Sequence, residues 1–87
     1  MQIIYSPRFI KDYNRLDISI KIKAEKKEEI FRRNPFDNRL KTHKLSARLF
    51  GLWSFSINID CRIIFEFKSE KVTIFHAIGG HSIYNRF

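Results

Sequence analysis

The sequence predicts an α+β domain with the order β-α-α-β-β-β, in which two N-terminal helices pack against one face of a small, mostly antiparallel sheet. Two stretches with helical spacing of apolar residues follow an apolar segment at residues 2–5. From residue 53 onward apolar residues alternate with polar ones, which is typical of strands. Helices followed by a run of strands indicate an α+β fold, and we expect one domain over residues 1–87.

The N-terminal half should contain one strand and two helices. Residues 2–5 have the composition of a short strand. Ser6 and Pro7 form a typical helix start, because serine caps free backbone N–H groups and proline needs no donor at the first helical position. A second helix is expected over residues 19–33, and its many Lys and Glu side chains predict that it lies outside the sheet. It should end before Pro35, because the residue preceding a proline disfavours the helical conformation.

The C-terminal half should contain a charged loop followed by three strands. Residues 36–48 carry many charges and no regular pattern, so we expect a loop there. In residues 53–60 apolar side chains alternate with Ser, Asn and Asp, which predicts a strand with one solvent-exposed face. After a turn or bulge at residues 60–61, residues 62–67 predict the next strand. The largely apolar residues 72–78 predict a central strand, ended by two glycines.

The chain is strongly basic. It has 17 Lys and Arg against 9 Asp and Glu, a formal net charge of +8 and a pI near 10.0. Such a charge attracts polyanions, so nucleic acid is the first partner to expect, an acidic protein the second and an anionic membrane the third. The single cysteine, Cys61, allows no internal disulfide, which fits the cytoplasmic location that we expect. No run of about 18 apolar residues is present, so we expect neither a membrane span nor a signal peptide.

The histidines do not form a metal-binding pattern. The three of them lack HxH or HxxxH spacing and a nearby carboxylate cluster, so we expect neither a metal nor another cofactor. His76, inside the last apolar strand, is expected to be a satisfied core or edge histidine. A nuclease without a metal would have to use the RNA 2′-hydroxyl as its nucleophile, with a base, an acid and cations around the phosphate. Its products would be a 2′,3′-cyclic phosphate and a 5′-hydroxyl.

Two histidines are candidates for proton transfer. His43 lies in a basic loop with Lys41, Lys44 and Arg48. Neighbouring cations disfavour the charged imidazole, which predicts a neutral side chain that can act as a base. The alternative is a surface histidine without a role. His81 follows two glycines, which let the chain turn off the last strand and deliver a side chain to a site, and the alternative here is a histidine in a mobile tail.

Arginine and aromatic residues supply candidate phosphate and base contacts. Arg62 begins a strand on its polar side and could grip a phosphate with two hydrogen bonds, the alternative being a surface pair with Asp60. Trp53 is a candidate stacking platform, with a place in the core as the alternative. Tyr84 and Phe87 could stack on unpaired bases or dock back onto the sheet.

Three segments resemble the RelE/ParE superfamily of small bacterial toxins, and most closely its YafQ-like branch. They are NPFDNRLKTHKL, GLWSFSINIDCRIIFEF and IGGHSIYNRF, which correspond to a THKL-like segment, G-x-W-S-F, D-x-R-I-I-F-E and I-G-x-H. The resemblance covers nearly the whole chain and implies two N-terminal helices on a small sheet. It also implies ribosome-dependent mRNA cleavage and silencing by a co-transcribed antitoxin.

The resemblance also implies roles for individual residues. Those expected to be catalytic are His43, Asp60, Arg62 and His81. Those expected to hold RNA are Lys41, Lys44, Arg48, Trp53, Ser56, Tyr84, Arg86 and Phe87. Two positions depart from the family. Ser56 stands where a His, Lys or Arg is common, and Asn85 occupies the usual place of the terminal aromatic, for which Tyr84 or Phe87 would substitute.

The leading hypothesis is a cytoplasmic toxin of a type II toxin–antitoxin system that cleaves mRNA on the ribosome without a metal. Its partners would be the ribosome, mRNA and an antitoxin whose acidic and apolar segment folds on binding. One alternative is a ParE-like toxin that inhibits DNA gyrase by binding it, without cleavage. Such a binding function would not need the two histidines. The other is a basic RNA- or ribosome-binding module without catalytic activity.

Overall fold

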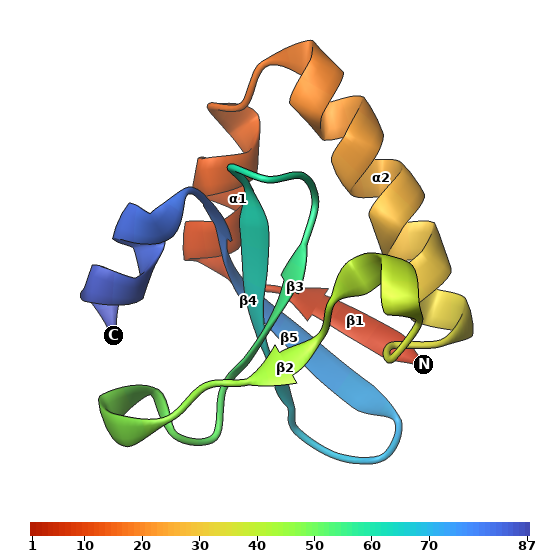
Figure 1. The fold of residues 1–87 in the computed structure, drawn as a ribbon, viewed down its shortest axis with the longest axis vertical. Helices are drawn as coiled ribbons and strands as arrows, with labels where there is room; N and C mark the ends of the chain where they lie inside the picture. Colours follow the sequence, from red (N-terminus) through yellow and green to blue (C-terminus); the bar gives the residue numbers. More distant parts are fainter.

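A computed structural model describes residues 1–87, and Figure 1 shows its elements. The strands are β1 (Gln2–Tyr5), β2 (His43–Lys44), β3 (Trp53–Ser56), β4 (Arg62–Phe67) and β5 (Val72–Gly79). The helices are α1 (Pro7–Asn14) and α2 (Ile18–Arg33), with three short 3-10 helices at Asn38–Leu40, Ala47–Leu49 and His81–Arg86. We call the last of these the C-terminal helix. None of the helices is long and apolar enough to cross a membrane.

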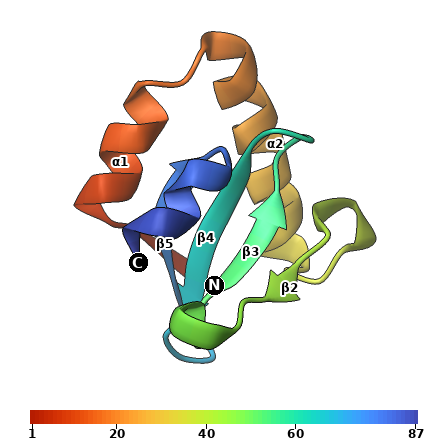
Figure 2. The same cartoon turned by 60° about the vertical axis from the view of Figure 1, so that its left-hand side comes forward.

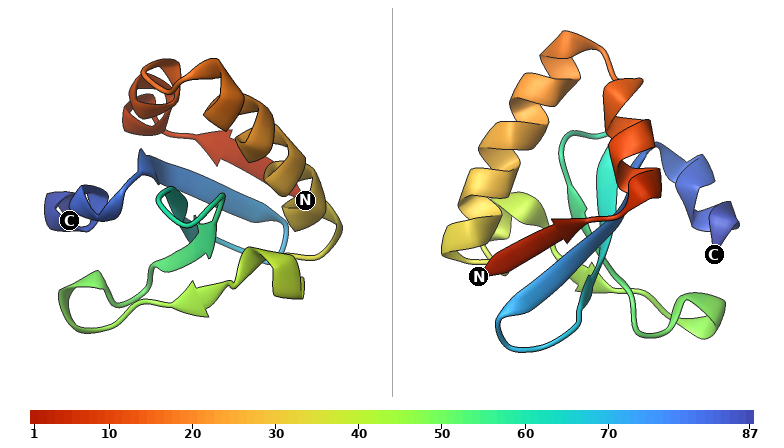
Figure 3. Two further views of the ribbon diagram at one scale, coloured as in Figure 1. Left: turned by 45° about the horizontal axis from the view of Figure 1, so that its top comes forward. Right: turned by 180° about the vertical axis from the view of Figure 1, so that it is seen from behind.

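The strands form one sheet in the order β1-β5-β4-β3-β2. β1 is parallel to β5, whereas every other neighbouring pair is antiparallel. β5 lies inside the sheet, as its apolar sequence predicts, while β4 occupies the centre. Both α1 and α2 lie on the same side of the sheet, as the left view of Figure 3 shows. The predicted α+β class, with two N-terminal helices on a mostly antiparallel sheet, is confirmed.

Local capping explains where the two long helices begin and end. The Ser6 hydroxyl accepts a hydrogen bond from an N–H of the first turn of α1 at 3.0 Å, and Pro7 occupies the first helical position, as predicted. Asp17 accepts a hydrogen bond of 3.2 Å from the first turn of α2, which begins one residue earlier than predicted. α2 also ends before Pro35, as predicted.

Phenylalanine rings form the centre of the core between α2 and the sheet. Phe31 of α2 is fully buried. Its ring centroid lies 4.8 Å from that of Phe55 in β3 and 4.9 Å from that of Phe65 in β4. It lies 5.5 Å from that of Phe75 in β5. One side chain therefore joins the helix to three strands, and each aromatic pair adds roughly 0.5–1.5 kcal/mol to the stabilisation from burial.

A smaller core lies on the other face of the sheet. Ile64 of β4 points away from the phenylalanine core, because side chains alternate along a strand. It packs with Ala77 of β5 and Ile83 of the C-terminal helix. Gly79 allows this helix to approach, since a Cβ at that position would lie only 2.9 Å from the Ile83 side chain. The C-terminal helix therefore covers the face of the sheet that α1 and α2 leave free.

Three expectations for the middle of the chain are wrong. Residues 36–48 are not only a loop, because they contain β2, which pairs with β3 at the edge of the sheet. The strand expected over residues 53–60 ends at Ser56, where the Cys61 carbonyl accepts backbone hydrogen bonds from the next two residues and closes a turn. Ser54, expected on a solvent-exposed face, is only 1% exposed because the C-terminal helix covers it.

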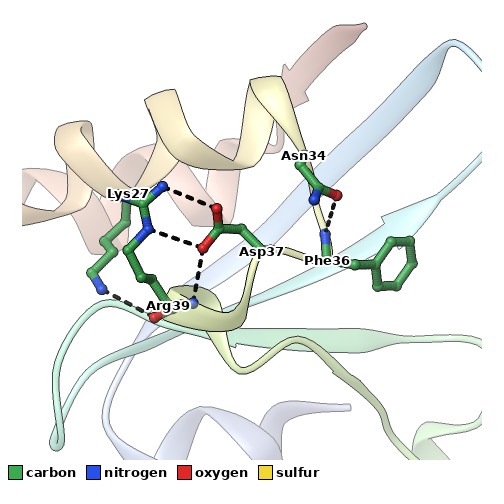
Figure 4. Close-up of polar contacts among 5 residues, drawn as sticks. All are labelled: Lys27, Asn34, Phe36, Asp37 and Arg39. Carbon is green, nitrogen blue, oxygen red and sulfur yellow. Dashed lines mark hydrogen bonds and ion pairs between the residues drawn. The ribbon is translucent and has the colours of Figure 1, made fainter.

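Polar and charged side chains hold the connection from α2 to β2 (Figure 4). Asp37 accepts hydrogen bonds from the Arg39 backbone N–H at 2.9 Å and from the Arg39 guanidinium at 2.9 and 3.0 Å. Lys27 of α2 donates to the Arg39 carbonyl at 3.1 Å, and Asn34 accepts from the Phe36 N–H at 3.0 Å. These contacts fix the backbone that leads into β2.

Replacing Phe31 should test its place in the core. We expect Phe31→Ala to lower the free energy of unfolding by about 3–5 kcal/mol, because it removes buried aromatic contacts and leaves a cavity. Urea unfolding followed by Trp53 fluorescence measures this loss. Phe50→Ala is the matched control: its side chain is 83% exposed, so the change should stay below about 0.5 kcal/mol. Equal losses in the two variants would contradict the assignment.

The Asp37 contacts predict a pH dependence. Hydrogen bonds from the Arg39 side chain lower the pKa of the Asp37 carboxyl to about 2. Because this folded-state pKa lies below the unfolded value of about 3.9, the contacts stabilise the fold above that pH. That stabilisation is lost as the pH falls through about 2. In an NMR titration, Arg39→Gln should raise the Asp37 midpoint toward about 4. Arg33→Gln, which removes a cation paired with Glu29 on α2, should leave the midpoint in place.

Candidate functional site

Polar side chains meet where the C-terminal helix covers β3 and β4. Tyr84 lies at their centre, with its ring centroid 5.8 Å from that of the His81 imidazole and 6.0 Å from Cζ of Arg62. Its hydroxyl lies 3.1 Å from the Ser54 hydroxyl. We call Arg62, His81, Tyr84 and Ser54 the Tyr84 cluster. It gathers an imidazole, a guanidinium and a phenol on the face of the sheet opposite α1 and α2.

Arg62 enters the cluster from the first position of β4, where it pairs with Ser56 of β3 and Gly79 of β5. Its Nη2 donates to the Ile59 carbonyl at 3.2 Å, whereas its Nε is buried and has no hydrogen-bond partner. It makes no ion pair with Asp60, so the surface-pair alternative is wrong. Buried donors without acceptors are uncommon, because their desolvation costs free energy. The Arg62 side chain as a whole is only half-buried, so the rest of the guanidinium can take a further acceptor.

His81 begins the C-terminal helix and has an exposed side chain. Because this helix packs back onto the sheet, His81 lies beside Tyr84 rather than in a free tail. Phe87 packs in the same way, with its ring centroid 6.2 Å from that of His76. Both tail aromatics therefore dock on the sheet, which was one of the two alternatives for them.

His43 flanks the cluster from the edge of the sheet. It pairs with Ser54 across β2 and β3, so the two side chains lie on the same face. The His43 Nδ1 lies 3.0 Å from the Lys41 carbonyl oxygen. A carbonyl only accepts hydrogen bonds, so this contact places a proton on Nδ1 and leaves Nε2 as the acceptor of the neutral ring. The side chain is exposed.

Asp60 lies at the rim of the cluster, exposed in the turn between β3 and β4. Its backbone N–H is bonded to the Asn58 side chain at 2.8 Å, which fixes the turn. A Cβ on Gly80 would lie 3.4 Å from the Asp60 carbonyl oxygen, so the turn passes close to the start of the C-terminal helix. The carboxylate thus belongs to the same end of the sheet as Arg62 and His81.

Trp53 lies on the other face of the sheet from the cluster. Its ring centroid is 5.6 Å from that of Phe36 and 5.3 Å from that of Phe67, and it packs at the margin of the main core. Lys44, its partner across β2 and β3, has Nζ 5.5 Å from the Trp53 ring. The structure therefore separates these two residues from Arg62 and Tyr84.

Two arginines expected to hold RNA make intramolecular contacts. Arg48 Nη1 donates to the backbone oxygens of Tyr84 at 2.9 Å and Phe87 at 2.6 Å, which ties the C-terminal helix to the segment before β3. Arg86 Nη1 lies 2.8 Å from both carboxylate oxygens of Asp12 in α1. Each of these cations therefore positions the C-terminal helix.

Sequence reasoning did not find Ser54 and Asp12, which support the site. Ser54 was assigned to solvent because of strand alternation, and nothing local indicates that a distant helix covers it. Asp12 is 7% exposed and also accepts from the Ile78 N–H at 3.2 Å. Asp12 lies three residues after Phe9 and four before Leu16. This helical spacing places it on the apolar side of α1, which was the available signal that it is buried. His76 pairs with Glu66 at 2.8 Å, so the prediction of a satisfied histidine is confirmed.

The remaining reactive groups limit the chemistry of the site. Cys61 precedes Arg62, but burial raises the pKa of its thiol, which opposes formation of the nucleophilic thiolate. No group of three or more His, Cys, Asp or Glu side chains could hold a metal ion. The groups available at the cluster are therefore an imidazole, a phenol and a cation, which suit proton transfer and phosphate binding.

No protein-family model matches the sequence, and no curated protein matches it. Among solved structures, the YoeB/ParE toxin from Agrobacterium tumefaciens matches with a TM-score of 0.79 at 21% identity, over 93% of this chain and 99% of that one. YafQ from E. coli strain BL21(DE3) matches with 0.74 at 21% identity, over 95% and 96%. A chain of the heterotetrameric YoeB–YefM toxin–antitoxin complex from Staphylococcus aureus matches with 0.75 at 22% identity, over 93% and 97%.

These matches span nearly the whole of each chain, and their low identities show a shared fold. The fold that the resemblance of the three sequence segments implies is thus confirmed. The chain has the fold of the RelE/ParE toxins, with YafQ among the structures that it resembles.

Proposed function

We propose that this chain is the toxin of a type II toxin–antitoxin pair and that it cleaves mRNA on the ribosome, in the cytoplasm and without a metal ion. The Tyr84 cluster carries the proposal, because it places a histidine and a half-buried arginine around the same tyrosine ring. The formal net charge of +8 and the fold shared with YoeB and YafQ support it.

The reaction uses only groups that the RNA and these side chains supply. A base removes the proton from the 2′-hydroxyl, whose oxygen forms a bond to the adjacent phosphorus. The bond from phosphorus to the 5′-oxygen breaks, and an acid protonates that oxygen. A 2′,3′-cyclic phosphate and a 5′-hydroxyl result, with each positioned acid or base contributing roughly 10²- to 10⁴-fold in rate.

Arg62 is the phosphate-binding group in this scheme. A phosphoryl oxygen would accept from the part of its guanidinium that this half-buried side chain leaves accessible. The guanidinium is held by the Ile59 carbonyl and lies against the Tyr84 ring, so it is oriented before substrate arrives. A preorganised cation stabilises the charge that develops on phosphorus more in the transition state than in the ground state.

The two exposed histidines take the proton-transfer roles. His81 belongs to the cluster itself, whereas His43 lies on β2, two strands away from Arg62 on β4. Two strand spacings and an offset of two residues along the strands separate the backbones of His43 and Arg62 by about 12 Å. A bound phosphate would therefore lie between the His43 and His81 side chains. Asp60 at the rim supplies an acidic group that can orient an imidazole. The ribosome would complete the positioning of the message.

Some residues of the predicted RNA-binding set would touch RNA, whereas others act by positioning the C-terminal helix. Tyr84 offers a ring for a base next to the scissile phosphate, and Ser56 lies on the same face, opposite Arg62. Lys41 is exposed in the turn before β2, where its carbonyl oxygen contacts His43. Lys44 and Trp53 would meet a more distant part of the RNA or ribosome at the other side of β2 and β3. The remaining three residues of the predicted RNA-binding set, Arg48, Arg86 and Phe87, position the C-terminal helix.

The antitoxin is the second partner that we propose. YoeB is found in a complex with YefM, and a chain of that complex shares the fold of this protein. Ile10 of α1 and Ile18 and Ile22 of α2 are 50%, 67% and 49% exposed, so apolar surface is free for a partner on the helical side. A segment that adds acidic side chains would complement the basic chain and could fold on it.

One observation favours a function without cleavage. Ser56, beside Arg62, stands where a His, Lys or Arg is common in the family, so this site has one charged group fewer. A ParE-like inhibitor of DNA gyrase would leave mRNA intact and accumulate gyrase–DNA breaks. A basic RNA- or ribosome-binding module would leave both intact.

Primer extension on a reporter mRNA after brief induction tests the proposal. We expect cuts at defined codon positions with the wild type, and roughly 10²- to 10⁴-fold less cleavage with His81→Ala, which removes a proton-transferring group. His76→Gln is the control, because this histidine pairs with Glu66 outside the cluster. Growth arrest with unbroken message would refute cleavage.

Replacing Arg62 tests the phosphate contact. Arg62→Gln should reduce single-turnover cleavage on programmed ribosomes by about 10²- to 10³-fold, because it removes a preorganised cation. Arg62→Lys should recover part of this loss, since it keeps the charge but not the planar donor set. Urea unfolding should confirm that both variants fold. Cleavage by folded Arg62→Gln within about threefold of wild type would assign the phosphate contact elsewhere.

A further inference from the structure

A second basic site lies beside the Tyr84 cluster, in a depression between α1 and the C-terminal helix. These two helices are neighbours in Figure 2 and in the right view of Figure 3. The depression has a volume of about 340 Å³. All five residues that line it are charged: Arg8, Lys11, Asp12, Arg15 and Arg86. None of them but Arg86 has an assigned role in RNA binding.

Helical spacing explains the concentration of charge. Arg8, Lys11 and Arg15 recur every three or four residues around Asp12, which puts them on one face of α1 and its C-terminal end. Asp12 is neutralised by Arg86, whereas the three α1 cations are exposed and form no ion pair. Like charges at this spacing repel one another, and this repulsion destabilises the helix. A bound anion would offset the repulsion.

The ion pair between Asp12 and Arg86 holds one cation of this depression in a fixed position. Asp12 is 7% exposed, and its carboxylate contacts Arg86 Nη1 at 2.8 Å and the Ile78 N–H of β5 at 3.2 Å. The Arg86 side chain keeps a third of its surface exposed. One guanidinium is thus held in place while it still faces the ligand, which lowers the entropy lost on binding.

We propose that this depression binds the phosphodiester backbone of RNA at a point separate from the reacting phosphate. A lining of charged residues alone favours phosphate over a nucleobase, which would need an aromatic or apolar surface, and over an antitoxin segment, which would add apolar contacts. Arg86 and His81 share the C-terminal helix, so RNA held here would also steady the helix that carries the proton-transferring group. The inference rests on the proposed RNA substrate, but it concerns binding and not cleavage.

RNA binding by a neutralised variant tests this site. The triple variant Arg8→Gln, Lys11→Gln, Arg15→Gln changes exposed side chains without ion pairs, so it should fold as the wild type does. The matched control is Lys23→Gln, Lys26→Gln, Lys71→Gln, which changes three exposed lysines elsewhere. Both variants lower the formal net charge from +8 to +5. Thermal unfolding should show that both are folded.

Affinity would be measured across a range of salt concentrations for a single-stranded RNA and for an RNA duplex. We expect the α1 variant to bind about tenfold more weakly than the control, with a slope of log affinity against log salt that is smaller by about 1–2, because phosphate contacts are lost. A loss confined to the single strand would identify the substrate strand as the ligand. A loss confined to the duplex would identify folded ribosomal RNA.

Equal effects of the two variants, or no effect of either, would overturn the inference. So would unchanged RNA affinity together with weaker binding of an acidic peptide, because the site would then be one for protein. Failure of the proposed function has a different signature. A wild-type protein that leaves mRNA intact while its α1 variant still loses RNA affinity would refute the cleavage proposal and keep this binding site.

Discussion

Asp12 lies under the C-terminal helix, where its carboxylate meets the Arg86 guanidinium and the Ile78 N–H. This contact joins α1, β5 and the C-terminal helix, three elements that are distant in sequence. A buried carboxylate without its cation would be strongly destabilising, so the position of the helix is tied to the charge of Arg86. The geometry of the Tyr84 cluster depends on this contact together with the Arg48 hydrogen bonds and the packing of Ile83.

The sheet separates stability from chemistry. One face carries the phenylalanine core beneath α2, where Phe31 contacts three strands. The other face carries Arg62, Ser54 and His43, covered or flanked by the C-terminal helix. Successive side chains of β3 and β4 point to opposite faces of the sheet. A shift of β4 by one residue would therefore turn Arg62 into the core and a phenylalanine into the site.

Local signals in the sequence predicted much of the fold and three of the four residues of the Tyr84 cluster. The Ser6 cap, the limits of β1 and β4, and the end of α2 follow from neighbouring residues. β2 could not be predicted, because two residues become a strand only through β3. Arg62 and His81 were recognised as candidates, but their meeting at Tyr84 depends on the docked C-terminal helix. For the same reason Arg48 and Arg86 turned out to make contacts within the protein.

The parallel pairing of β1 with β5 delays completion of the fold until β5 has been synthesised. Gln2 is paired with Val72 and Tyr5 with Phe75, so β1 is separated from its partner strand by about seventy residues of sequence. Pairing over such a sequence separation slows folding, because a long loop must close, with a loss of conformational entropy, before the stabilising contacts form. During translation β1 therefore leaves the ribosome without a neighbour, and the Tyr84 cluster can assemble only once the last strand and the helix after it have emerged. The order of the strands thus delays the formation of the site until β5 and the C-terminal helix have left the ribosome.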